Sequence, residues 1–170
     1  MSALTELAPT LKASESRYLS KLIRSWDLLA DLSFADLLLC IPEDNSTKTS
    51  YVIVAHVRPT TSRSIYRKEM EGRIFTRGER PFFDEARQSG QIIDGGLILQ
   101  SPVERIRTLS VPVLFDGKVI AVLSRDFSPD GQRVAGDLEM TYFSLFRRLA
   151  LMISQNCYPF QEAGTESEFS

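Results

Sequence analysis

The stretch from Trp26 to Ile41, WDLLADLSFADLLLCI, constrains the fold more than any other part of the chain. It contains the end of an amphipathic helix, a break at Ser33, and a strand from Phe34 to Ile41. Successive strand residues point to opposite faces of a sheet, and both faces are apolar here: Leu37, Leu39 and Ile41 on one, Leu38 and Cys40 on the other. A strand that is apolar on both faces is covered on both sides. We therefore expect it near the centre of a sheet, close to the preceding helix.

The composition is that of an ordinary globular domain. The chain has 170 residues, of which 43% are hydrophobic, and this is enough for one domain with a substantial core. Its 20 Lys and Arg residues nearly balance 22 Asp and Glu residues, so a net charge of -2 gives no electrostatic footprint for nucleic acid. Residues 1–16 lack the pattern of a signal peptide, and no window approaches the roughly 18 apolar residues of a membrane helix. We expect a soluble, cytoplasmic protein that binds neither nucleic acid nor membrane.

We expect a looser segment at each end of the domain. We expect residues 1–13 to be a flexible lead-in, residues 14–157 to form the domain, and residues 158–170 to be a linker or tail. Apolar residues at three- and four-residue spacing predict a first helix over residues 15–32, capped by Ser14, and a last helix over residues 136–156.

Between the terminal helices the pattern changes to strands. Residues 51–57 are rich in β-branched side chains and form a second strand after a polar turn at residues 42–50. Residues 60–80 are basic and variable in pattern, with short extended pieces expected at 64–66 and 72–76. A short helix begins at Pro81 and ends near Gly90, and Asp94-Gly95-Gly96 reads as a turn.

The clearest local signal is a β-hairpin. Residues 107–115 (RTLSVPVLF) and 118–125 (KVIAVLSR) flank the dipeptide Asp116-Gly117. A two-residue Asp-Gly loop between apolar strands is the strongest short hairpin signal in a sequence. The two strands should therefore lie side by side in the sheet.

This order of elements, with Ser110-Val111-Pro112-Val113, Asp116-Gly117 and the strand 119–123, resembles a GAF domain. More specifically, WDLLADLSFADLLLCI, Arg58-Pro59-Thr60-Thr61, VIAVLSR and LEMTY resemble the N-terminal GAF-like sensor domain of certain actinobacterial cytoplasmic histidine kinases. The resemblance covers roughly residues 15–160. It implies an α/β (α+β) fold: an antiparallel sheet with the N- and C-terminal helices packed on one face and a ligand pocket on the other.

The resemblance also implies a place in a larger protein. In that family the sensor domain precedes a PAS domain and then the kinase modules, and the usual partner is a response regulator with an RNA-binding antitermination domain. This chain would be the isolated input domain. The chain itself has no P-loop and no kinase ATP-binding glycine set, and its single histidine lies in a strand, so we expect no catalytic residues, no cofactor and no autophosphorylation by this chain alone.

The single histidine and the two cysteines offer little chemistry. His56 lies in a strand, where it shares a face with Val52 and Val54, and a hydrogen-bonded sheet histidine is the favoured interpretation. No Cys/His cluster predicts a metal site, and Cys40 and Cys157 are expected to be free thiols. A role for Cys40 as a redox or metal sensor stays open, but its apolar neighbours favour a buried, inert thiol.

The candidate ligand contacts lie in and around the variable segment. Arginines at strand ends can bind an anion with two hydrogen bonds, and aromatic rings can line a pocket wall. We expect a pocket on the sheet face opposite the terminal helices, covered by residues 60–100, with these candidate contacts: Arg58, Phe75, Phe83 and Arg107. Surface arginines and core phenylalanines are the simpler alternative.

The terminal helices carry more apolar surface than one sheet contact requires. The surplus residues predict a symmetric dimer interface formed by these residues: Tyr18, Leu28, Phe143, Ala150 and Leu151. Three functions follow. The first is a sensory input domain that binds a small ligand or relays a dimer rearrangement through its last helix. The second is a dimerisation scaffold without a ligand, and the third is a thiol-dependent reductase.

Overall fold

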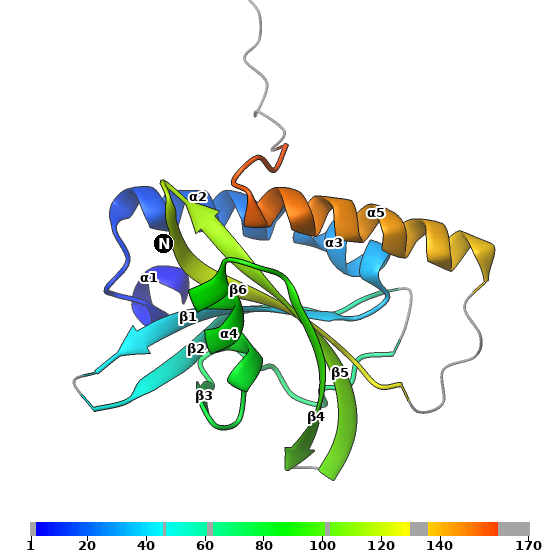
Figure 1. Ribbon diagram of the computed structural model, residues 1–170, viewed down its shortest axis with the longest axis horizontal. Helices are drawn as coiled ribbons and strands as arrows, with labels where there is room; N and C mark the ends of the chain where they lie inside the picture. The colour runs from blue at the N-terminus through cyan, green and yellow to red at the C-terminus, as the bar shows by residue number, and fades with distance from the viewer. Residues whose placement is uncertain (1–2, 46, 61–62, 101–102, 130–135, 160–170) are drawn as a thin grey trace, which may run out of the picture.

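A computed structural model describes residues 3–45, 47–60, 63–100, 103–129 and 136–159. In this part of the chain, six strands form one antiparallel sheet in the order β3-β2-β1-β6-β5-β4 (Figure 1). The strands are β1 (Asp36–Asp44), β2 (Thr49–Val57), β3 (Ile74–Thr76), β4 (Ile93–Gln100), β5 (Val103–Phe115) and β6 (Lys118–Phe127). The expected α/β (α+β) class is confirmed.

Helices cover the two faces unequally. The helices are α1 (Ala3–Leu7), α2 (Ala13–Arg24), α3 (Trp26–Ser33), α4 (Pro81–Ser89) and α5 (Asp137–Ser154). The N- and C-terminal helices α2, α3 and α5 lie along one face, which we call the helix face, as expected (Figure 1). The short α4 and the segment that leads to it lie on the other face, which we call the cavity face.

Strand β1 lies between β2 and β6, as its two apolar faces predict. Leu37, Leu39 and Ile41 join the core beneath the terminal helices. Leu38 and Cys40 join a smaller apolar cluster on the cavity face. The strand begins at Asp36 rather than Phe34, because Phe34 takes a left-handed conformation (φ 53°) at the end of α3.

The first expected helix is in fact two. Ser25 ends α2, where its hydroxyl donates to the Leu22 carbonyl at 2.7 Å, and α3 begins at the next residue. The start of α2 also differs from expectation: Lys12, not Ser14, is the N-cap, and the Glu15 carboxylate accepts a hydrogen bond from the Lys12 backbone N–H at 3.0 Å. A capping box of this kind satisfies a backbone donor that the helix cannot.

The lead-in was wrongly expected to be flexible throughout. Residues 3–7 form α1, and Leu4 and Ala8 are buried in the core beneath the terminal helices. The segment therefore belongs to the folded domain. Most of the expected tail, residues 160–170, lies outside the described residues.

A β-bulge changes the face on which His56 lies. Leu39 pairs with Ala55 and Cys40 pairs with Ile53, so Val54 has no partner on β1. Such an extra residue shifts the alternation of side chains by one. His56 therefore lies on the cavity face with Tyr51 and Ile53, and the expectation that it shares a face with Val52 and Val54 is wrong.

Local turn signals were confirmed at two places and failed at one. The Asp116-Gly117 hairpin joins β5 to β6, with positive φ at both residues (50° and 74°), and α4 runs from Pro81 to a left-handed Gly90. Asp94-Gly95-Gly96 is not a turn, because β4 runs straight through it beside β5. A Cβ on Gly95 would lie 2.4 Å from the Phe82 ring, so close packing explains this glycine.

The variable segment contains less strand than expected. Ile74–Thr76 forms β3 at the sheet edge, within the expected piece at residues 72–76. Residues 64–66 form no strand, and they cross the cavity face as an irregular segment.

Candidate functional site

The cavity face carries a cavity of about 640 Å³. Its floor and walls come from residues 65–81 and from Leu97, Ile98 and Leu99 on β4. Four of the lining residues are cationic (Arg67, Lys68, Arg73, Arg80), whereas only Glu79 is acidic. Tyr66, Phe75 and Met70 add aromatic and apolar surface. This chemistry suits a small anion that also carries a flat apolar part.

Arg80 is the buried cation of this cavity. Its guanidinium donates to the two Asp126 carboxylate oxygens at 3.3 and 3.1 Å, and to the Tyr66 hydroxyl at 2.7 Å. It also lies over the Phe75 ring, with 4.5 Å from its central carbon to the ring centroid. Burial alone lowers the pKa of Arg80, but the adjacent Asp126 raises it above its usual value, so the group stays charged.

Asp126 has four donors for its carboxylate. Besides Arg80, it accepts hydrogen bonds from the Tyr66 hydroxyl at 2.5 Å and from the Ser124 hydroxyl at 2.7 Å. Burial alone raises the pKa of Asp126, but Arg80 and these hydrogen bonds hold it below its usual value. Burial also raises the pKa of Tyr66, which therefore stays a neutral donor. The result is a charge-balanced, buried network at the back of the cavity.

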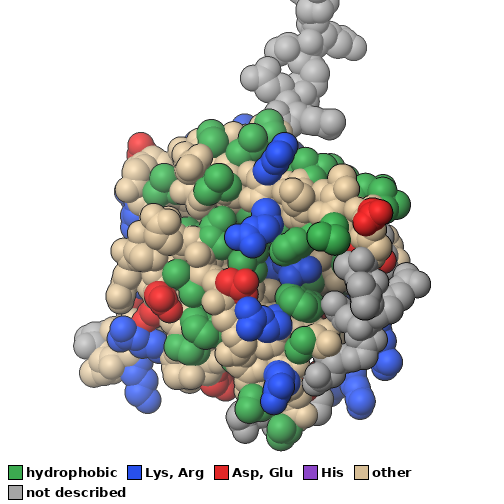
Figure 2. Space-filling model, turned by 45° about the vertical axis from the view of Figure 1, so that its right-hand side comes forward, with side chains coloured by type: hydrophobic (Ala, Val, Ile, Leu, Met, Phe, Trp, Pro, Cys, Tyr) green, Lys and Arg blue, Asp and Glu red, His purple; other side chains and the backbone are tan. Residues whose placement is uncertain are grey.

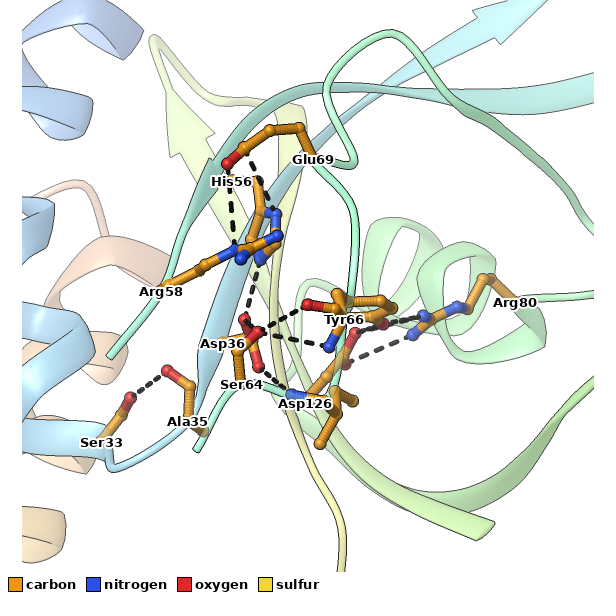
Figure 3. Close-up of polar contacts among 11 residues, drawn as sticks. Ser33, Ala35, Asp36, His56, Arg58, Ser64, Tyr66, Glu69, Arg80 and Asp126 are labelled. Atoms are coloured by element: carbon orange, nitrogen blue, oxygen red, sulfur yellow. Dashed lines mark hydrogen bonds and ion pairs between the residues drawn. The ribbon is translucent and has the colours of Figure 1, made fainter. Parts of the chain in front are cut away.

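A second polar cluster lies beside the first and is centred on the Asp36 carboxylate (Figure 3). The Asp36 carboxylate is 2.8 Å from His56 Nε2, and it accepts hydrogen bonds from the Ser64 hydroxyl at 2.6 Å and the Ile65 backbone N–H at 2.9 Å. Because Asp36 lies between Ser64 and His56, the imidazole does not face the hydroxyl. This is not the order in which a histidine activates a serine nucleophile.

Ion pairs fix α4 to the sheet. Asp84 on α4 accepts a hydrogen bond from the Tyr51 hydroxyl of β2 and pairs with Arg77. Arg87, at the other end of α4, pairs with Asp44 of β1 through two contacts of 3.0 and 2.6 Å. The helix is therefore held at two positions, Asp84 and Arg87, and Phe83 next to the first of them is fully buried.

The four predicted ligand contacts lie in different places. Phe75 lines the cavity, and Phe83 lies buried next to it, in edge contact with Tyr51 and Phe75. Arg58 is outside the lining and pairs with Glu69 at 3.9 Å. Arg107 is also outside the lining, exposed and paired with Asp94 at 3.0 Å. Only one of the four residues therefore touches the space in which a ligand would lie.

Sequence reasoning missed Tyr66 and Asp126 and noted Arg80 only as part of a basic segment. Arg80 and Asp126 are 46 positions apart, so no local pattern connects them. The one available signal was the isolated acid at the end of an apolar strand, Arg125-Asp126, which needed a buried partner.

The five predicted dimer contacts also differ in exposure. Ala150 is fully buried, so it has no surface to offer a second copy. Tyr18 stacks on Phe115 at 4.7 Å, and Phe143 packs against Phe146 and Arg125. Leu28 and Leu151 are exposed. Buried contacts within the monomer thus use much of the apolar surplus that the sequence suggested.

Helix α5 also carries a largely exposed apolar stripe. The residues facing the sheet are Phe146, Ala150 and Ile153. Beside them runs a stripe of Leu138, Tyr142, Leu145, Leu149 and Met152, of which Leu138 is 63% exposed and Leu145 45%. Figure 2 shows hydrophobic side chains along the top of the molecule, where α5 runs in Figure 1. The alternating spacing of four and three residues is that of a helix that packs against another helix.

Other kinds of site receive no support from the described residues. Among them, no group of three metal-binding side chains occurs, and no helix is long and apolar enough to cross a membrane. Both cysteines are free, Cys40 buried in the sheet and Cys157 exposed after α5. Their placement gives no support to a thiol-dependent reductase.

Comparison with known proteins identifies the family. A family model described as the GAF domain of the histidine kinase PdtaS matches residues 1–145. The sensor histidine kinase PdtaS of Mycolicibacterium smegmatis is 28% identical over 155 residues, which are 88% of this chain and 30% of that protein. PdtaS of Mycobacterium tuberculosis is 29% identical over 154 residues, with the same two coverages.

A solved structure agrees with this result. The sensor region of a sensor histidine kinase superposes with a TM-score of 0.73 at 27% identity, covering 94% of this chain and 55% of that one. The chain therefore belongs to the family of PdtaS GAF domains, which are sensory domains of histidine kinases. This confirms the resemblance to sensor domains of actinobacterial histidine kinases. The chain spans about 30% of the length of the curated relatives that it matches.

Proposed function

We propose that this domain is the non-catalytic sensory input of a two-component histidine kinase in the cytoplasm, and that it binds a small anionic ligand in the cavity. PAS and kinase modules would follow it in the full-length protein, and a response regulator would receive the phosphoryl group. The observation that carries the proposal is the excess of cations and aromatic rings around an otherwise apolar cavity of about 640 Å³. Arg67, Lys68 and Arg73 would meet the anion, and Phe75 would contact its flat part.

A fluorescent aromatic sulfonate, 8-anilinonaphthalene-1-sulfonate, has this chemistry and can serve as the first probe. We expect it to bind the folded domain and to be displaced by a small aromatic carboxylate or a mononucleotide. Replacing two cavity cations (Lys68→Ala with Arg73→Ala) should weaken probe binding at least about fivefold, because a hydrogen bond to a charged group contributes about 1.5–3 kcal/mol.

The matched control removes the same charge outside the cavity. Arg105→Ala with Arg107→Ala changes two exposed arginines of β5, neither of which lines the cavity. Its effect on the dissociation constant should stay within about twofold. Equal weakening by both double variants would show that the probe responds to net charge alone, and the cavity would then not be its site.

A second candidate function, a dimerisation scaffold, has its own support in the exposed stripe of α5. Two copies packing this stripe against each other would form a symmetric helical interface. Leu28 and Leu151 are exposed as well, but the helical period places Leu151 on another side of α5 than the stripe. A stable interface buries on the order of 800 Å² per partner. In a sensor of this kind, ligand binding would change how the two α5 helices pack, and α5 would pass that change to the downstream modules.

Sedimentation tests the dimer directly. Leu138→Glu with Leu145→Glu should convert a dimer into a folded monomer, because four charges would meet at the interface. Val103→Glu, which changes an even more exposed apolar residue at the start of β5, should leave the dimer intact. An unmodified domain that sediments as a monomer at high concentration would contradict the proposal for this chain.

A further inference from the structure

Strand β6 carries two buried charges on neighbouring residues. Arg125 and Asp126 are 8% and 0% exposed. Neighbouring residues of a strand point to opposite faces, so Asp126 lies on the cavity face and Arg125 on the helix face. The pairing with β1 is regular here, with Leu37 opposite Arg125 and Asp36 opposite Asp126. The two charges are therefore joined by one peptide unit in a part of the sheet without a bulge.

At the cavity end, Asp126 holds two residues that line the cavity. It accepts hydrogen bonds from Tyr66 and from both terminal nitrogens of Arg80. Arg80 Nε has no hydrogen-bond partner among the described residues, although it is buried. A ligand that takes the hydrogen bond of the Tyr66 hydroxyl, or that draws away the terminal nitrogens of Arg80, therefore competes with Asp126, whereas a ligand that accepts only from Arg80 Nε does not.

At the helix end, Arg125 holds the two terminal helices. Its Nε and Nη2 atoms donate to the Ser33 carbonyl, the last of α3, at 3.1 and 2.6 Å. Its guanidinium lies over Phe143 of α5 and Phe127 of β6, at 4.5 and 4.3 Å from the ring centroids. Burial lowers the pKa of Arg125 to about 10.

Strand β1 repeats the arrangement beside it. Asp36 holds Ser64 and Ile65 on the cavity face, and it directly follows the turn that ends α3 (Figure 3). In that turn, the Ser33 hydroxyl donates to the Ala30 carbonyl at 2.9 Å and to the Ala35 carbonyl at 3.3 Å. Ser33 therefore takes part in the turn that leads into β1, and its carbonyl also accepts the hydrogen bonds from Arg125.

We propose that Arg125 and Asp126, with Asp36 beside them, form a relay through the sheet that couples occupancy of the cavity to the position of α3 and α5. The relay rests on the proposed function, in which the cavity binds a ligand. An anionic ligand that draws Arg80 or Tyr66 away from Asp126 moves the end of β6. Arg125 then changes its contact with Ser33 and Phe143. A ligand favours such a change to the extent that it binds one arrangement better than the other.

Hydrogen exchange in the unliganded domain tests the relay with two matched variants. Tyr66→Phe removes the hydroxyl that donates to Asp126 of β6. Tyr51→Phe removes a hydroxyl of the same kind on the same face, but its acceptor is Asp84 of α4. One hydrogen bond contributes about 1 kcal/mol, so local exchange should change about fivefold where it acts. We expect Tyr66→Phe to raise exchange of α3 and the first half of α5 by this factor relative to the amides of β2, and Tyr51→Phe to raise only that of α4.

A second pair of variants covers the case in which Tyr66→Phe does not fold. Ser124→Ala removes a donor to Asp126, whereas Ser110→Ala removes the hydroxyl of the paired residue on β5, which has no hydrogen-bond partner among the described residues. Only Ser124→Ala should affect α3 and α5. Coupling is reciprocal, so Arg125→Lys should in turn raise exchange of residues 65–70.

The relay would be overturned if the two variants of each pair changed hydrogen exchange in α3 and α5 equally. An effect of Tyr66→Phe that stays on the cavity face would overturn it as well. Because no ligand is present in these experiments, such a result would leave the proposed ligand cavity unaffected.

Discussion

The two faces of the sheet are built in different ways. The helix face is an apolar core in which Leu, Val and Ile side chains of β1, β2, β5 and β6 meet Trp26, Phe146 and their neighbours. The cavity face has a smaller apolar cluster around Leu38, Cys40 and Phe83, and next to it lie the buried charges Arg80 and Asp126. Apart from the buried Arg125, the helix face therefore resembles the interior of any small domain, whereas the cavity face holds a buried ion pair.

This difference has an energetic meaning. Burial of apolar surface stabilises a fold in proportion to its area, whereas a buried ion pair often adds little, because desolvation of both charges offsets their attraction. The helix face therefore accounts for most of the stability. The cavity face holds the groups that the proposed ligand would meet, and β6 contributes side chains to both faces.

The largest loss of stability is expected from a substitution in the core of the helix face. Phe146→Ala should lower the free energy of unfolding by about 3–5 kcal/mol, because it leaves a cavity in the core beneath α5. Leu145→Ala, the neighbouring residue on the exposed stripe, should cost less than about 1 kcal/mol. Urea unfolding of both variants measures the difference, and similar costs would contradict the assignment of these two residues to buried and exposed positions.

The next largest loss of stability is expected from a substitution in the buried ion pair of the cavity face. Asp126→Ala should cost about 3 kcal/mol, because it leaves Arg80 buried without its carboxylate. The double variant Arg80→Met with Asp126→Leu should recover most of that loss and yet weaken binding of the sulfonate probe, because it removes one of the cations that line the cavity. Urea unfolding and probe titration together check this prediction. Failure of the double variant to recover stability would mean that the ion pair itself stabilises the fold.

Acid should weaken the cavity face in a defined direction. The pKa of Asp126 is lower in the folded state than in the unfolded chain, so its contribution is fully present above the unfolded value of about 3.9 and is lost as the pH falls through the folded value. Asp126→Asn cannot titrate. The gap in unfolding free energy between the unmodified domain and Asp126→Asn should therefore narrow from pH 6 to pH 3, and a constant gap would contradict the prediction.

The smallest change in stability is expected at an exposed ion pair, outside the buried parts of both faces. Arg107 forms an exposed ion pair with Asp94, and exposed pairs contribute about 0–1 kcal/mol. Arg107→Ala should therefore change the unfolding free energy by less than about 0.5 kcal/mol. A thermal or urea melt is sufficient to check it, and a loss as large as that of Asp126→Ala would show a role for Arg107 that its exposure does not suggest.

Short-range patterns predicted much of the fold. The alternation in Phe34–Ile41 placed β1 at the centre of the sheet, and Asp116-Gly117 and Pro81 placed a hairpin and a helix start. Each of these signals acts within a few residues. The turn predicted at Asp94-Gly95-Gly96 was wrong because residues far away in the sequence determine the conformation there. Gly95 lies against Phe82, and the whole segment pairs with β5.

The candidate site was much less predictable. Phe75, one of the predicted contacts, lines the cavity, but Tyr66, Arg80 and Asp126 converge from an irregular segment, the residue before a helix and a central strand. The bulge at Val54 has no signature in the sequence, and it alone decides the face on which His56 lies. On α5, one apolar face could not be told from two until the position of the sheet was known.

Cys40 gives the sheet a built-in chemical reporter. Burial raises the pKa of this thiol, and only the thiolate reacts quickly with alkylating reagents. Cys157 is exposed and should be modified at once, whereas Cys40 should react only when the centre of the sheet opens to water. After Cys157 is blocked, the alkylation rate of Cys40 therefore measures how often β1 separates from its neighbours, and it does so without a substitution anywhere in the domain.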